Sequence, residues 1–145
     1  MDRERAGFTL MEILVVVLII TILAAVVGVK VAHRPAEARM VAAEAQIRNL
    51  RTALQLYRME QGRYPTQRQG LEALCKLPDT APIPERYPEG GYLESPVLPK
   101  DPWGHDYVYL IPGPEGFPYL IVSYGANGEP GGEGEDADVS SAQLP

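Results

Sequence analysis

The sequence predicts an α+β fold in which a long N-terminal α-helical spine packs on a small antiparallel β-sheet. Three patterns indicate this. Residues 13–29 form an uncharged apolar run, and residues 36–61 carry apolar side chains at helical spacing. Near the C-terminal end, two segments rich in β-branched and aromatic residues flank a turn of proline and glycine. The chain of 145 residues can form one modest globular head behind the spine.

The apolar segment that starts at Phe8 and ends at Val29 is long enough to cross a membrane, which takes about 20 mostly apolar residues as a helix. Glu12 stands out, because a carboxylate in such a helix costs about 2.5 to 3.5 kcal/mol at mid-bilayer and less near the interface. If the chain were cut between Gly7 and Phe8, the new α-amino group could neutralise Glu12. The alternative is an ordinary membrane anchor with one acid near its end.

Residues 1–7 form a short polar leader that precedes the apolar run. In an ordinary secretory signal the apolar region instead lies before the cleavage site and is removed with it. Arg3 and Arg5 favour a cytoplasmic N-terminus under the positive-inside rule. The predicted organisation is therefore a leader over residues 1–7, a transmembrane helix over 8–34, and a head over 35–145.

The second half of the predicted spine is amphipathic, whereas its first half is apolar all round. Spacings of three and four residues place its apolar side chains on one stripe, which should cover the sheet. That stripe consists of Ala43, Ile47, Leu50, Leu54 and Tyr57. A kink is expected near Gly28 or Pro35, because glycine and proline weaken a helix.

The head begins after Gly62, which is a helix stop signal. Thr66-x-x-Gln69 matches a capping box and predicts a short helix that runs to about Lys76. The prolines of residues 78–102 predict an extended loop that wraps the head.

Residues 107–111 and 119–123 are predicted strands of an antiparallel hairpin. Because a two-stranded hairpin alone is marginally stable, we expect a third strand near Tyr92 and Leu93. After Val139 the chain is expected to be frayed.

Residues 125–138 place oxygen-bearing side chains between glycines, and from Asn127 to Asp138 there are five acids and no base. Calcium takes six to eight oxygen ligands, and glycines let backbone carbonyls turn inward. A calcium-binding loop is therefore one interpretation, and a disordered acidic tail is the other.

Composition excludes several classes of function. The net charge is −6 and no cluster of Lys and Arg is present, which disfavours a nucleic-acid partner. Cys75 is the single cysteine, so no intrachain disulfide is possible, and it is expected to be buried. Neither His33 nor His105 lies near a Ser or Cys nucleophile motif, so no catalytic residue is expected and the chain is predicted not to be an enzyme.

The opening Gly7-Phe8-Thr9-Leu10-Met11-Glu12 before an apolar helix resembles the class III signal of type IV pilins and pseudopilins. Later segments resemble, in the same order, the major pseudopilins of the bacterial type II secretion system, the general secretion pathway protein G family. These segments are Arg63-Tyr64-Pro65-Thr66 with Gln69-Gly70-Leu71, Asp101-Pro102-Trp103-Gly104, and Ser123-Tyr124-Gly125-Ala126-Asn127-Gly128. The resemblance implies a pilin-like fold.

The resemblance also implies cleavage after Gly7 by a prepilin peptidase, N-methylation of Phe8 and a role of Glu12 in filament assembly. It implies a single-pass protein of the bacterial inner membrane whose head lies in the periplasm. There it would polymerise into a pseudopilus that drives folded exoproteins through the outer membrane, with residues 8–34 as the helix of the filament core. The implied partners are copies of itself, minor pseudopilins, an inner-membrane assembly platform and a cytoplasmic ATPase.

A type IV pilin that forms a surface or DNA-uptake fibre is the alternative. A disulfide-closed C-terminal loop is common among such pilins and is impossible with one cysteine.

For the protein G family, the resemblance further implies a calcium site in the loop after the last long strand. The implied ligands are the carbonyl of Tyr124 and the side chains of Asn127, Glu135, Asp136 and Asp138. Asn127 stands where relatives usually carry aspartate, and the segment that usually ends the family's chains is replaced here by residues 140–145.

Overall fold

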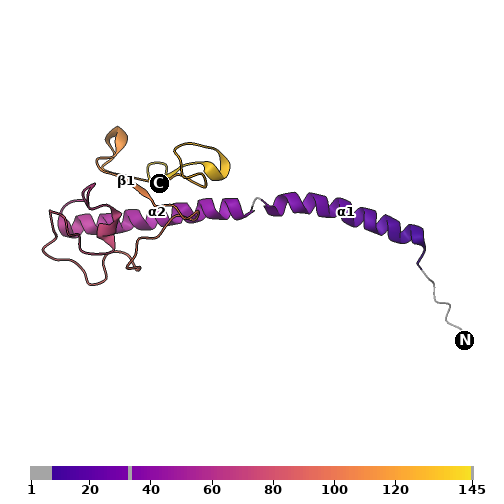
Figure 1. The fold of residues 1–145 in the computed structure, drawn as a ribbon, viewed down its shortest axis with the longest axis horizontal. Coiled ribbons are helices and arrows are strands. Elements are labelled where there is room, and N and C mark those ends of the chain that lie inside the picture. The colour runs from indigo at the N-terminus through magenta and orange to yellow at the C-terminus, as the bar shows by residue number, and fades with distance from the viewer. Residues whose placement is uncertain (1–7, 33, 145) are drawn as a thin grey trace, which may run out of the picture. The chain divides into compact units, whose positions relative to one another are not determined.

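The computed structural model describes residues 8–32 and 34–144, with side chains for residues 8–24 and 36–144. The chain divides into two compact units, Met1–Pro35 and Ala36–Pro145. Helix α1 (Leu10–Ala32) belongs to the first unit (Figure 1). Nearly all of α2 (Arg34–Gln61) belongs to the second unit, which we call the head.

The structure describes two helices over the predicted spine, and the residue between them, His33, lies outside the described residues. Helix α1 continues through Gly28, and the predicted kink near Pro35 stays a prediction. At the C-terminal end of α2, the N–H of Gly62 donates to the Arg58 carbonyl (2.8 Å), and the φ of Gly62 is +72°. Glycine tolerates this conformation, so Gly62 ends α2 as predicted.

The predicted transmembrane segment, residues 8–34, extends beyond the side chains that the structure describes. No helix formed by the described residues is both long and apolar enough to cross a membrane.

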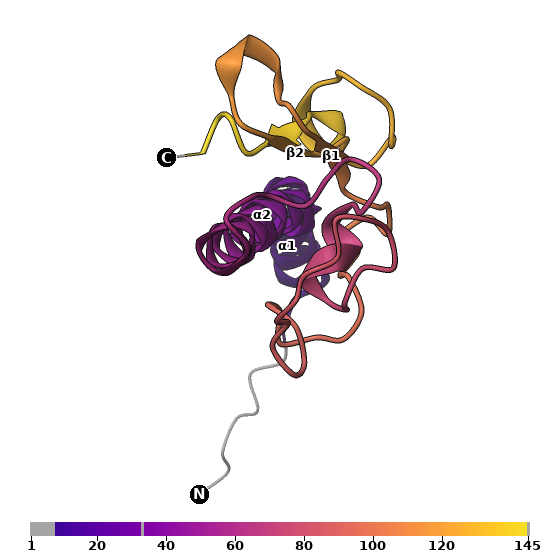
Figure 2. The same cartoon turned by 90° about the vertical axis from the view of Figure 1, so that its left-hand side faces the viewer.

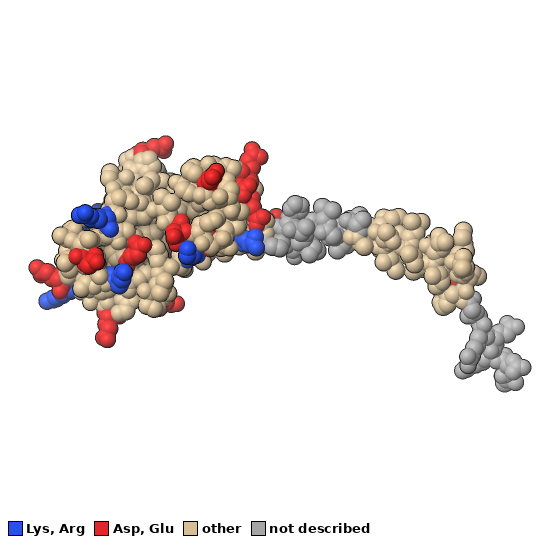
Figure 3. Space-filling model, viewed as in Figure 1, with Lys and Arg blue, Asp and Glu red and all other residues tan. Residues whose placement is uncertain are grey.

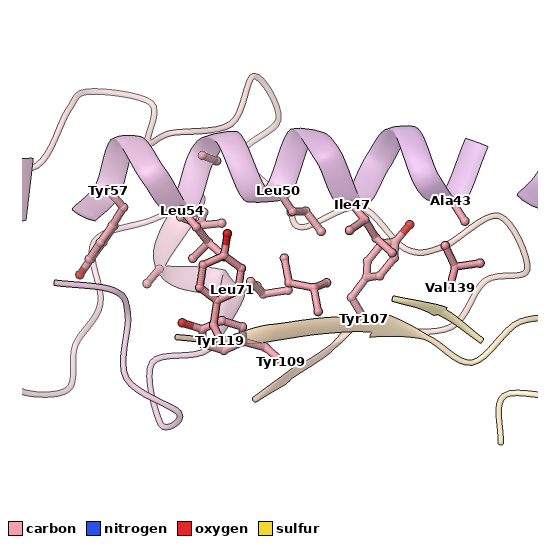
Figure 4. Close-up of a cluster of buried hydrophobic side chains, with 14 residues drawn as sticks. Ala43, Ile47, Leu50, Leu54, Tyr57, Leu71, Tyr107, Tyr109, Tyr119 and Val139 are labelled. Atoms are coloured by element: carbon pink, nitrogen blue, oxygen red, sulfur yellow. The ribbon is translucent and has the colours of Figure 1, made fainter. Parts of the chain in front are cut away.

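The apolar stripe of α2 forms the centre of the head's core. Its five members are between 0% and 1% exposed, which confirms the prediction from their spacing. Figure 4 shows them facing the aromatic side chains of the sheet region, with Tyr107, Tyr109 and Tyr119 among the buried residues. Cys75 is also buried, as predicted, and burial raises the pKa of its thiol.

The sheet has three antiparallel strands, β1 (Val108–Leu110), β2 (Leu120–Ser123) and β3 (Val139–Ser140), in the order β1-β2-β3. It covers one face of α2, and the long loop between α2 and β1 passes along another side (Figure 2). The predicted α+β class, with a helical spine on a small antiparallel sheet, is confirmed.

The third strand is not where it was predicted. Tyr92 and Leu93 lie in a loop, where the N–H of Tyr92 donates to the Leu74 carbonyl (2.7 Å). The third strand is instead β3, whose Val139 pairs with Ser123. The expectation of a frayed C-terminus was therefore wrong: the N–H of Ser141 donates to the Ile121 carbonyl (2.9 Å), and the Ser141 hydroxyl accepts from the Ile121 N–H (3.0 Å).

The capping box at Thr66 forms its hydrogen bonds without the predicted α-helix. The N–H of Gln69 donates to Thr66 Oγ1 (3.2 Å), and the N–H of Thr66 donates to Gln69 Oε1 (3.0 Å). Gly70 then takes a φ of +62°, which ends the turn, and a short 3₁₀ helix follows over Leu71–Leu74. Two further 3₁₀ turns are Pro114–Gly116 and Gly134–Asp136.

Candidate functional site

The first turn of α1 contains the predicted assembly residue Glu12. The N–H of Glu12 donates to the hydroxyl of Thr9 (3.2 Å), so Thr9 caps the helix. Glu12 is an acid in the first turn, where the helix dipole favours negative charge. Gly7, the predicted cleavage position, lies outside the described residues, whereas Phe8 is described and is 78% exposed.

The described part of α1 exposes apolar side chains on every side. All residues from 8 to 24 are exposed, and the large apolar ones range from 43% at Val15 to 85% at Leu10. In Figure 3 the charged side chains gather on the head, whereas the visible face of this part of α1 is almost free of them. No ion pair between described residues includes Glu12. Within one chain, this surface has no buried stripe comparable to that of α2.

The predicted calcium ligands lie in residues 124–138, which we call the acidic loop. Most of their side-chain oxygens already have partners. Both carboxylate oxygens of Asp138 accept from the N–H of Gly131 (3.0 Å each), and Asn127 Oδ1 accepts from the N–H of Glu129 (3.1 Å). Glu135 forms an ion pair with Arg39 of α2 (2.9 Å). Asp136 is exposed and Tyr124 is half-buried.

Backbone carbonyls crowd two glycines of this loop, Gly125 and Gly132. A Cβ at Gly125 would lie 2.6 Å from the carbonyl oxygen of Glu135 and 2.9 Å from that of Ala137, and one at Gly132 would lie 2.6 Å from that of Asp136. Only glycine fits such a close approach. The available donors are carboxylate, amide and carbonyl oxygens, a set that fits the chemistry of calcium. In the described residues, however, no three His, Cys, Asp or Glu side chains are grouped to hold a metal ion.

One buried polar cluster next to the loop was missed by the sequence reasoning. Asp101 is 4% exposed, and its Oδ1 accepts from the N–H groups of Trp103 (3.1 Å) and His105 (2.8 Å). Its Oδ2 accepts from the hydroxyl of Ser123 on β2 (2.5 Å). The Asp-Pro-x-Gly pattern is typical of a turn, but nothing in it indicates a contact with a strand 22 residues later.

Comparison with known proteins places these features in a family. Residues 30–142 match the family model described as "Type II secretion system (T2SS), protein G", and residues 2–28 match the prokaryotic N-terminal methylation motif. The chain belongs to the type II secretion system protein G family. This pseudopilin is 45% identical over 139 residues to the type II secretion system core protein G of Pseudomonas aeruginosa, with 96% of each chain covered. It is also 45% identical over 142 residues to that of Vibrio cholerae, covering 98% of this chain and 94% of the relative.

The fold of the pseudopilin is similar to a crystal structure of the major pseudopilin from the type 2 secretion system of enterohaemorrhagic Escherichia coli. The TM-score is 0.63 at 36% sequence identity, and the match covers 74% of this chain and 90% of that one. The predicted family and the predicted role as a structural pseudopilus subunit in type II secretion are thereby confirmed. These matches favour this role over the alternative of a type IV pilin.

Proposed function

We propose that this pseudopilin polymerises through α1, and that residues 8–34 anchor the chain in the inner membrane before assembly. The observation that carries the proposal is the exposure of apolar side chains on every side of the described part of α1. Apolar surface of this extent is stable only when lipid or other apolar surface covers it. Lipid would cover it in the single-pass protein, and helices of neighbouring copies would cover it in the filament.

Glu12 directs this assembly in the proposal. Cleavage after Gly7 by a prepilin peptidase would give Phe8 a free amine, and N-methylation would leave that amine basic. A neighbouring copy's amine could then pair with the Glu12 carboxylate. Such a pair removes the cost of an isolated charge in an apolar environment, so it favours addition of a subunit at the correct depth.

The head would lie in the periplasm, where the growing pseudopilus drives folded exoproteins through the outer membrane. The energy would come from a cytoplasmic ATPase that acts through an inner-membrane assembly platform, with minor pseudopilins as further partners. In this proposal the chain acts by its surface and its polymerisation, and it performs no enzymatic reaction.

Substitution of Glu12 tests the proposed assembly mechanism. We expect Glu12→Ala and Glu12→Gln to remain membrane-inserted and to lose most of the filament yield, as seen by shearing and electron microscopy. Glu37→Ala is the matched control, because Glu37 is likewise an exposed acid in the first turn of a helix. Normal filament yield from the Glu12 variants would contradict the charge-pairing mechanism.

The mass of the membrane-extracted protein tests its processing. The mature chain should begin at Phe8 and carry one additional methyl group. An intact chain from Met1 to Pro145 would exclude the pilin-type pathway.

We also propose that the acidic loop binds calcium (Ca²⁺). The residues that would hold it are Tyr124 through its carbonyl, Asn127, Glu135, Asp136 and Asp138. The oxygen-only donor set and the carbonyls that crowd Gly125 support this proposal. Bound calcium would offset the mutual repulsion of the acids and stabilise the loop for assembly.

Thermal unfolding tests calcium binding, because a ligand that binds the folded state raises its stability by mass action. Millimolar calcium should raise the Tm of the full chain in detergent relative to chelator. Asp138→Asn should reduce this shift, whereas Asp79→Asn, an exposed acid outside the loop, should retain it. Identical melting curves with calcium and with chelator would remove the site.

A further inference from the structure

His105 joins the Asp101 cluster to the acidic loop. Its Nδ1 lies 3.0 Å from the carbonyl oxygen of Gly125. Its ring also lies against Gly128, where a Cβ would come within 3.1 Å of Cε1 and 3.2 Å of Nε2. The His105 side chain therefore contacts two positions of the loop, while its own N–H is held by Asp101.

The direction of the Gly125 contact follows from its acceptor. A carbonyl oxygen only accepts hydrogen bonds, so Nδ1 must carry the proton. Nδ1 carries a proton in one neutral tautomer and in the charged imidazolium alike, so the contact does not require a charged His105. Oδ2 of the Asp101 carboxylate lies 3.9 Å from Nδ1, beyond hydrogen-bond distance.

Ser123 also connects Asp101 to Gly125 by hydrogen bonds. The Ser123 hydroxyl donates to Asp101 and lies 3.4 Å from the N–H of Gly125. The cluster therefore contacts both backbone groups of Gly125, its carbonyl through His105 and its N–H through Ser123. At this same residue a φ of +64° and the crowding carbonyls require glycine.

The combination of Asp, His and Ser does not form a nucleophilic site. Ser123 is 0% exposed, and its hydroxyl donates to the carboxylate rather than to the imidazole. A nucleophilic serine instead needs a base that takes its proton and access for a substrate. The three side chains instead position the backbone of Gly125.

We propose that Asp101, His105 and Ser123 form a metal-independent clamp that holds the first residues of the acidic loop in place. Within the clamp, the His105 side chain contacts the loop at two positions, Gly125 and Gly128. The clamp would keep the loop ordered before any cation binds, which lowers the ordering cost of binding. It does not depend on the calcium proposal, because every contact of the clamp is between protein groups.

Hydrogen exchange of the full chain in detergent, with chelator present, tests the clamp. The reporter is the N–H of Ala126, which donates to the Glu135 carbonyl (2.9 Å). In His105→Ala and His105→Leu, exchange of the peptide that contains Ala126 should be about tenfold faster than in the unmodified chain. His105→Asn should restore most of the protection, because its side-chain amide can donate to the Gly125 carbonyl. Peptides of β1 and β2 should exchange as before in all three variants.

Three results would overturn the clamp: a loop that exchanges at free-peptide rates in the unmodified chain, unchanged exchange in His105→Ala, or failure of His105→Asn to restore protection. Because the chelator removes calcium from every sample, failure of calcium binding would not alter these outcomes.

Two glycines provide a matched test of the ring contact. Gly128 and Gly134 have similar φ values, +68° and +64°, but a Cβ at Gly134 meets no atom within 4 Å. The backbone strain of Gly128→Ala and Gly134→Ala is thus comparable, and only the former presses on His105. We expect faster loop exchange in Gly128→Ala than in Gly134→Ala, and no difference between them once His105→Ala is also present. Equal effects in the unmodified background would exclude the contact.

Discussion

Helices α1 and α2 follow each other in the chain and differ in where their apolar side chains find partners. Leu14 and Leu18 of α1 are 57% and 56% exposed, whereas Leu50 and Leu54 of α2 are 1% and 0% exposed. The same residue type in the same backbone conformation therefore stabilises different states. In α2 it stabilises the folded head, and in α1 it is available to lipid or to other copies.

The charges of the two helices differ in the same way. On α2, Arg48 pairs with Glu44 one turn earlier (3.3 Å) and Arg39 pairs with Glu135 of the acidic loop. Exposed pairs of this kind contribute only a few tenths of a kcal/mol to at most about 1 kcal/mol. Glu12 of α1 has no such ion pair with a described residue. These charges of α2 thus have partners within the chain, whereas a partner for Glu12 is what the proposed assembly would supply.

The largest expected effect is on the core side of α2. Leu54→Ala should destabilise the head by about 2 to 5 kcal/mol, because it removes a fully buried side chain and leaves a cavity. Leu56→Ala is the matched control on the same helix, since Leu56 is 44% exposed, and should cost less than about 1 kcal/mol. Urea unfolding in detergent, followed by fluorescence of the single tryptophan, Trp103, measures both. Equal costs would mean that the stripe does not hold the head together.

A smaller effect is expected where the proline-rich loop is fastened to the head. Gln69 is 6% exposed, and its Nε2 donates to the carbonyls of Thr80 (2.8 Å) and Pro82 (2.9 Å). Gln69→Ala leaves the Thr80 carbonyl and the Thr66 N–H without this partner, which should cost about 1 to 3 kcal/mol. The Pro82 carbonyl still accepts from Arg63 (2.8 Å). Gln55→Ala, at an exposed position of α2, should be nearly neutral in the same unfolding assay. A neutral Gln69→Ala would show that the Gln69 hydrogen bonds do not hold the loop in place.

The head should also lose stability at high pH through two half-buried tyrosines, Tyr87 and Tyr92. Burial is the largest cause that raises the pKa of Tyr87 and of Tyr92 from 10.0 to about 12. The unfolded chain therefore ionises first, so stability is full below pH 10 and declines as the pH rises toward about 12. Tyrosinate absorbance together with Tm as a function of pH measures this decline. Tyr92→Phe should make the decline shallower, and an unchanged pH profile would contradict the assignment.

The parts of the fold that were predicted from sequence depend on local repetition. The buried stripe of α2 was predicted correctly, because the apolar spacing that predicts the helix also predicts which of its faces is buried. The third strand was placed wrongly, because β3 has two residues and therefore no periodicity of its own. Its position depends on pairing with β2, and the intervening acidic loop conceals that pairing from any local pattern.

In the candidate site, too, the parts that are continuous in sequence could be predicted and the discontinuous part could not. The motif at Phe8 and Glu12 and the glycine-rich acidic loop are continuous in sequence, so both could be recognised. The clamp is discontinuous: Asp101 reaches Ser123, and His105 reaches Gly125 across 20 residues. Each of these residues has an ordinary explanation in its own segment, a turn or a strand, and only the fold brings them together.

The smallest expected effect gives the sharpest test of the comparison between the helices. Leu18→Ala should change the free energy of unfolding of the head by less than about 0.5 kcal/mol, because Leu18 is exposed and belongs to the other compact unit. Combined with Leu54→Ala, it should add nothing beyond the sum of the two single effects. The same Leu18→Ala should lower the yield of filaments, since the surface that it removes is the one proposed to pack between copies. A loss of head stability above about 1 kcal/mol would mean that the two units fold as one, and α1 would then contribute to the stability of the single chain as α2 does.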